Sequence, residues 1–76
     1  MKVQIKGDTE PVIVAGPEEL VTYLNETAEF SSESPSQYML DYAKRSVIQR
    51  DIDIRATDFI SFVEDLITNG DIKIII

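Results

Sequence analysis

The chain ends in Asp71-Ile72-Lys73-Ile74-Ile75-Ile76, and this hydrophobic segment decides the predicted fold. Four isoleucines in five residues favour a β-strand, because β-branched side chains pack well on a pleated surface. Adjacent apolar residues at Ile74 and Ile75 indicate burial on both faces of that strand. A segment this hydrophobic needs a partner, so we expect it to pair with another strand of the same chain.

The N-terminal residues supply that partner. Residues 1–6 alternate apolar and polar side chains, which is the two-residue period of a half-buried strand. Residues 7–10 carry turn chemistry, and residues 11–14 resume an extended apolar run. Together they predict a β-hairpin in which Pro11, lacking an N–H, suits an outer edge.

A first helix is predicted to begin at Pro17, because proline fits the first helical position. Glu18 and Glu19 follow in the first turn, where the helix dipole favours negative charge. The expected buried face is Leu20, Val21, Leu24 and Ala28, and the expected solvent face is Glu18, Thr22, Asn25 and Glu29.

A second helix is predicted after Ser34-Pro35-Ser36-Gln37. This segment places Ser34 at the cap, Pro35 first inside the helix and Gln37 at the reciprocal capping position. The expected buried stripe is Met39, Leu40, Ala43 and Val47.

Residues 51–55 alternate strictly between polar and isoleucine side chains, which predicts either a short strand or an extended connector. Thr57 or Asp58 then caps a third helix, and Asn69-Gly70 ends it, because Gly accepts the left-handed conformation that closes a helix. The apolar arc expected on this helix is Phe59, Phe62, Val63, Leu66 and Ile67.

These elements predict a single compact α+β domain over residues 1–76, in the order β-β-α-α-(short β)-α-β. The N-terminal β-hairpin and the C-terminal strand form a small, mostly antiparallel sheet packed against three helices. A sheet this small has two edges, so 12–14 or 72–76 can pair with another chain. We therefore expect homo-oligomerisation through a sheet edge as one mode of association.

The composition removes most catalytic chemistry. The chain has no Cys and no His, which excludes disulfides, thiolate metal sites and the commonest general base. The carboxylate pairs Glu18/Glu19 and Glu64/Asp65 fit a helix start and a solvent-facing helix surface. We expect no enzymatic activity, no catalytic residues and no cofactor.

A metal site is also not expected. A calcium loop beginning at Asp51 would require an oxygen ligand at Arg55, a glycine at Ala56 and a glutamate at Phe62, and all three requirements fail.

The net charge of −7, from 14 acidic and 7 basic residues, restricts the partners. An acidic chain is repelled by phosphate backbones and by anionic membranes. The N-terminal residues lack the apolar region of a signal peptide, and no run approaches the length of a membrane span. We expect a cytoplasmic protein that binds neither membranes nor nucleic acid, and whose partner is a protein with a basic surface.

The candidate binding surface lies on the second helix. Tyr38, Tyr42, Arg45 and Gln49 form a stripe roughly opposite the predicted core face, and Tyr and Arg often dominate the energetics of protein interfaces. In the alternative interpretation, the two tyrosines pack under the loop that carries Phe30.

In its brevity, acidity and lack of Cys and His, the chain resembles the small accessory proteins of phages and mobile elements. That resemblance implies an inhibitor whose carboxylates imitate nucleic-acid phosphates in a basic groove of a host protein. The candidate acidic face is Glu18, Glu19, Glu26, Glu29 and Glu33, which also fit a solvated helix surface.

The predicted function is a non-catalytic protein–protein interaction module that acts by stoichiometric binding. The alternative is a small nucleic-acid-binding transcriptional regulator with a winged-helix-like arrangement. Its binding residues would be Lys44, Arg45, Arg50 and Arg55.

Overall fold

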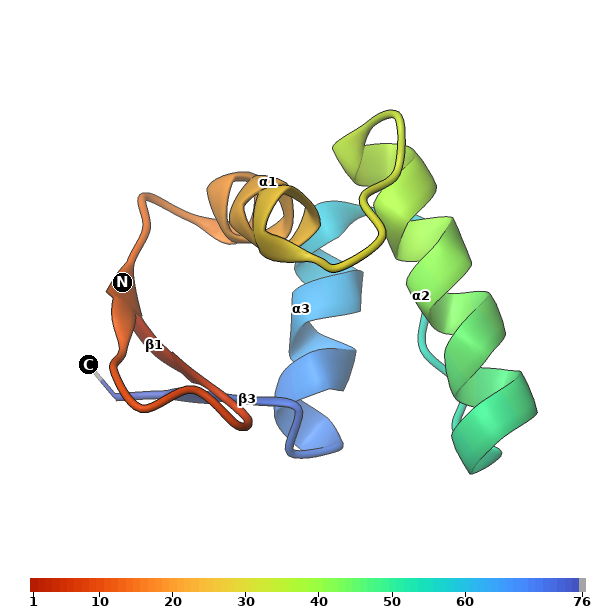
Figure 1. Cartoon of the computed structure of the whole chain (residues 1–76). Helices are drawn as coiled ribbons and strands as arrows, with labels where there is room; N and C mark the ends of the chain where they lie inside the picture. Colours follow the sequence, from red (N-terminus) through yellow and green to blue (C-terminus); the bar gives the residue numbers. More distant parts are fainter. Residues whose placement is uncertain (76) are drawn as a thin grey trace.

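The computed structural model describes residues 1–75 and contains an antiparallel three-stranded sheet with its helices on one side (Figure 1). This arrangement confirms the predicted α+β fold. The elements are β1 (Lys2–Ile5), β2 (Val12–Ile13), α1 (Pro17–Thr27), α2 (Pro35–Arg50), α3 (Phe59–Thr68) and β3 (Ile72–Ile74).

The two ends of the chain meet in the sheet, as the hydrophobic terminus predicted. The strand order is β2-β1-β3, so β1 is central and the other two strands form the edges. Val3 pairs with Val12 on one side and with Ile74 on the other, and both pairings are antiparallel. The three-stranded sheet therefore forms only when the C-terminal strand pairs with the N-terminal hairpin.

One face of the sheet covers the core and the other is open. Val3 and Ile72 are buried against the helices, so the alternate residues face away from them. We call this second surface the open sheet face. It consists of Lys2, Gln4, Ile13 and Lys73, continued beyond β3 by Ile75.

The expected burial of the C-terminal strand on both faces is wrong. Ile75 is exposed, because its side chain belongs to the open sheet face, where no described element lies over it. Ile74, on the core side, is also only partly covered, since it lies at the end of the strand. Ile76 lies outside the described residues.

Helix α1 begins at Pro17 as predicted and buries Leu20 and Val21. Asn25, which the sequence pattern assigned to the solvent face, is buried instead. Its side-chain oxygen accepts the Ser32 backbone N–H at 2.7 Å, and its amide donates to the Ser32 carbonyl at 3.1 Å. These two bonds satisfy the buried amide and hold the loop between α1 and α2.

The predicted cap of α2 forms, but its reciprocal half does not. The Ser34 hydroxyl accepts the Gln37 backbone N–H at 3.1 Å, and Pro35 is the first helical residue. The Gln37 side chain instead donates to the Asp41 carboxylate at 2.9 Å. Asp41 also accepts from the Ser32 hydroxyl at 2.7 Å, so this polar group ties the helix to the preceding loop.

The predicted buried stripe of α2 is wrong in part, because the helix is rotated about its axis. Met39 is buried, but Leu40 and Val47 are 53% and 48% exposed. Tyr38 takes the core side instead, and Tyr42 packs edge-on against Phe62 of α3, with ring centroids 5.5 Å apart. Aromatic rings bury more area than leucine or valine, so the rotation favours the tyrosines.

Residues 51–58 form an extended connector and no strand, which decides between the two alternatives left by the sequence. Asp51 ends α2 in the left-handed conformation at φ 54°, which aspartate tolerates better than most residues. Ile54 is buried and Ile52 is partly buried, so both isoleucines anchor the connector.

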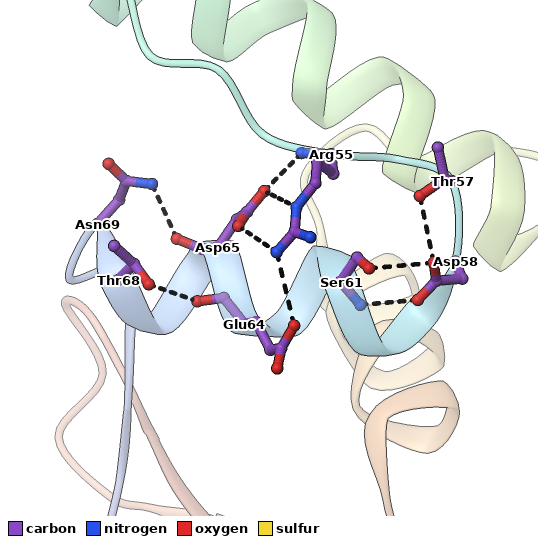
Figure 2. A network of polar contacts seen from close by, with 8 residues as sticks. All are labelled: Arg55, Thr57, Asp58, Ser61, Glu64, Asp65, Thr68 and Asn69. Atoms are coloured by element: carbon purple, nitrogen blue, oxygen red, sulfur yellow. Dashed lines mark hydrogen bonds and ion pairs between the residues drawn. The ribbon is translucent and has the colours of Figure 1, made fainter.

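Helix α3 begins at Phe59, and the carboxylate of the cap residue Asp58 accepts the Ser61 N–H at 2.8 Å (Figure 2). The apolar arc predicted for this helix is buried at Phe62, Val63 and Leu66, but Ile67 is 39% exposed. Gly70 follows the helix end with φ 80°, a conformation that few other residues adopt without strain.

Among residues 1–75, no helix combines the length and hydrophobicity that crossing a membrane requires.

Candidate functional site

A partly buried ion pair joins the end of α2 to the residue before β3. Arg50 Nη1 donates to Asp71 Oδ1 at 2.7 Å, and Nη2 donates to Oδ2 at 2.7 Å. The Tyr42 hydroxyl also donates to Oδ2, at 2.8 Å, and Arg50 Nη2 reaches the Ser46 hydroxyl at 3.3 Å. Asp71 is only 6% exposed, and these bonds give both of its carboxylate oxygens hydrogen-bond partners. We call these four residues the Asp71 cluster.

The pKa values in the Asp71 cluster follow from these bonds. The hydrogen bonds from Arg50 lower the pKa of Asp71, and the hydrogen bond from Tyr42 adds to this effect. The same bonds to Asp71 raise the pKa of Arg50. Burial, followed by the bond to Asp71, raises the pKa of the Tyr42 phenol. The cluster therefore holds one carboxylate, one guanidinium and one neutral phenol at neutral pH.

This cluster makes stability fall in acid. A carboxyl whose pKa is lower in the folded state stabilises the fold fully above its ordinary pKa of about 3.9, and that contribution disappears as the pH falls through the folded value. We expect that, as the pH is lowered from about 4, the free energy of unfolding decreases less steeply for Asp71→Asn than for the wild type. Urea titration at a series of pH values measures this. Parallel curves for the two proteins would contradict this assignment. The pKa values of Asp41, Asp58 and Asp65 are also lowered. Both proteins contain these three residues, so the difference between the two curves reports on Asp71.

The four residues of the predicted tyrosine–arginine stripe do not form one exposed surface. Tyr38 is 6% exposed, and Tyr42 is partly buried and bonded to Asp71. Arg45 lies 5.8 Å above the Tyr42 ring and is exposed, as is Gln49. The tyrosines are thus core residues, as the alternative held. Phe30 is itself 81% exposed, however, and the ring packed on Tyr42 is Phe62 of α3.

The outward side of α2 carries an apolar surface that sequence analysis missed. Leu40, Val47 and Ile48 are all exposed, and Lys44 lies between them on the same side. We call these four residues the outer α2 face. Positions 40, 44, 47 and 48 share one face because they are three, four, seven and eight residues apart. The sequence did carry a signal for this surface. Helix α2 has bulky side chains on two opposite sides, and only one of those sides can face the core.

All five residues of the predicted acidic face are exposed. Glu18, Glu19 and Glu26 lie on α1, and Glu29 and Glu33 follow in the loop before α2. None of them forms an ion pair within residues 1–75, although Glu19 accepts the Ala15 backbone N–H at 3.1 Å. Residues 7–43 contain eight acidic side chains and no Lys or Arg. We call the five glutamates the acidic surface.

The four cations of the alternative nucleic-acid site are not equally free. Arg50 is bonded to Asp71. Arg55 pairs with Asp65 at 2.8 Å and with Glu64 at 3.5 Å, and its backbone N–H also donates to Asp65 (Figure 2). These bonds hold the connector on α3. Lys44 and Arg45 remain as unpaired cations on α2 among the described residues, which leaves little positive charge for a phosphate backbone.

No family model matches the chain, and no curated protein or solved structure matches it either.

Proposed function

We propose that this chain is a non-catalytic protein-interaction module that binds one partner protein through the outer α2 face. One observation carries the proposal: Leu40, Val47 and Ile48 are exposed together on one side of a 16-residue helix. Grouped apolar side chains on a small domain are a feature of interaction sites, whereas single exposed ones are ordinary.

The chemistry of the outer α2 face indicates the kind of partner. A helix of this length spans about 24 Å, enough to fill a groove or to pack along another helix. The apolar side chains need an apolar counterpart, and Lys44 within the same surface favours a carboxylate beside it. An amphipathic segment with acidic flanks meets both requirements.

The state of the reactive groups supports a non-catalytic role. The Asp71 carboxylate is neutralised by Arg50, and the Tyr42 hydroxyl is bonded to it. The hydroxyls of Thr22, Thr27 and Thr68 donate to carbonyls of their own helices. Such groups are occupied in holding the structure, and the carboxylate beside the Tyr42 hydroxyl is itself paired with Arg50.

The test is capture of partners by immobilised wild-type protein and by Leu40→Asn/Val47→Asn/Ile48→Asn, compared quantitatively. We expect the variant to lose the specific partner at least tenfold, because each substitution removes apolar contact without disturbing the core. The purified partner should then bind the wild type with one-to-one stoichiometry in calorimetry.

A matched control is Ile60→Asn/Ile67→Asn, which alters two exposed isoleucines of α3 in the same way. This control should keep the partner. Equal retention by the wild type and the outer α2 variant would contradict the proposed surface. Equal loss from both variants would contradict it too, because binding would then follow general surface hydrophobicity.

The acidic surface favours a second candidate function, inhibition of a nucleic-acid-handling protein by occupying its basic groove. Five exposed glutamates in a segment without cations support it. Charge reversal at Glu26 and Glu29 should then weaken binding to the partner, and duplex DNA should compete with the wild type. If neither occurs with a partner in hand, the outer α2 face alone accounts for binding.

A further inference from the structure

The open sheet face has the opposite charge to the rest of the molecule. Two of the four lysines in the chain, Lys2 and Lys73, lie on it, and a third, Lys6, follows directly after β1. No Asp or Glu is among its residues, and none of these lysines forms an ion pair within residues 1–75. A protein of net charge −7 thus presents one locally positive, uncovered surface.

This surface also has apolar contacts to offer. Ile13 is 79% exposed and stands beside Lys2 across the β1–β2 pair. Ile75 continues the same face beyond β3 and is also exposed. An occupant of matching chemistry would carry carboxylates around an apolar group.

The chain itself carries such a surface. The acidic surface includes Glu29 and Glu33, and between them stands Phe30, with most of its ring exposed. Aromatic side chains are frequent anchors at the centre of interfaces. Figure 1 shows α1 and the loop that follows it lying away from the open side of the sheet, so one molecule cannot satisfy both surfaces internally.

We infer that the open sheet face docks the acidic surface of a second copy of this chain. This inference concerns different residues from the outer α2 face and does not depend on the proposed function. The interface is head-to-tail, because two different surfaces meet. It therefore extends to further copies or closes into a ring, whereas a two-fold dimer centred on the open sheet face would place lysines against lysines.

Ionic strength controls this association. The screening length is about 10 Å at 0.1 M salt and about 3 Å at 1 M. The molecule measures 30 × 24 × 22 Å, so at 0.1 M the repulsion between whole molecules is largely screened while charges in contact still attract. At about 0.1 M salt, the attraction across the interface is therefore strongest relative to the net repulsion. At about 1 M salt, screening weakens the attraction as well.

Sedimentation equilibrium over a concentration series reaching millimolar tests the inference. The wild type should show a weight-average mass that rises with concentration at about 0.1 M salt and returns to the monomer value at about 1 M. A monomer at every concentration in both salts would overturn the inference.

Two charge-reversal variants separate complementarity from net charge. Lys2→Glu/Lys73→Glu changes the net charge by −4, from −7 to −11, and Glu18→Lys/Glu26→Lys changes it by +4, from −7 to −3. If net repulsion alone governed association, the second variant would associate more than the wild type. Our inference requires the opposite: each variant alone stays monomeric, and an equimolar mixture associates again.

The four substituted side chains form no hydrogen bond or ion pair within residues 1–75, so both variants should remain folded. Glu18→Lys removes only the favourable interaction of Glu18 with the dipole of α1, which is a small contribution. Leu40→Asn/Ile48→Asn should associate like the wild type, because it alters only the outer α2 face. Loss of association in that variant would assign self-association to α2 and overturn the role of the sheet.

Discussion

Phe62→Ala should destabilise the protein by about 3–5 kcal/mol, the usual cost of deleting a fully buried aromatic ring. Phe62 is 0% exposed and lies on α3 where Tyr42 of α2 packs against it. The total stability expected for 76 residues is about 4–11 kcal/mol, so this single change removes a large part of it. Urea unfolding followed by far-ultraviolet circular dichroism measures the loss.

Phe30→Ala is the matched control, because it removes the same side chain from a position where the ring is exposed. A surface substitution of this kind should change the free energy of unfolding by no more than about 0.5 kcal/mol. Equal effects of the two substitutions would mean that α3 does not hold the centre of the core.

Asp71→Asn should destabilise the protein by about 2–4 kcal/mol. Breaking a buried ion pair from one side usually costs about 3–5 kcal/mol, and the figure here is reduced because a third of the Arg50 side chain remains in contact with water. The loss arises because Arg50 and the Tyr42 hydroxyl keep their positions but lose the carboxylate they bind. Asp65→Asn is a suitable comparison, because its partner Arg55 is more exposed and an exposed pair contributes about 1 kcal/mol or less.

A double-mutant cycle separates the ion pair from the rest of the Asp71 cluster. Arg50→Met alone leaves the Asp71 carboxylate buried without its cation, so we expect a loss similar to that of Asp71→Asn. The double variant Arg50→Met/Asp71→Asn should lose less than the sum of the two single losses, because neither partner is then left charged and unpaired. Additive effects would show that Arg50 and Asp71 are not coupled.

Local patterns in the sequence were enough for most of the secondary structure. The alternation in residues 1–6, the Ser34-Pro35 cap and the Asn69-Gly70 helix end each depend on neighbours a few residues away, and the structure contains all three. The isoleucine-rich C-terminal segment also indicated that it pairs with the N-terminal hairpin, because the sequence offered no other clear strand as a partner.

The orientation of α2 could not be read in the same way. The helix has apolar or aromatic residues around most of its circumference, so periodicity alone left several faces able to face the core. The burial of the tyrosine side and not the Leu40 side depends on groups that the rest of the fold brings beside α2, above all Phe62 and Asp71, which contact Tyr42. This is also why the predicted Tyr38–Tyr42 surface became core and an unpredicted aliphatic surface became exposed.

What the sequence by itself determined was an acidic α+β domain, with the positions where its helices begin and end, because these depend on composition and on contacts between near neighbours. Only the tertiary structure decided which side of α2 is buried, that Arg50 and Arg55 are neutralised, and that the lysines of β1 and β3 share an uncovered face. Those outcomes arise from residues distant in the sequence, such as Asp71 for Arg50 and Lys73 for Lys2, which the chain brings together only when its two ends pair in one sheet.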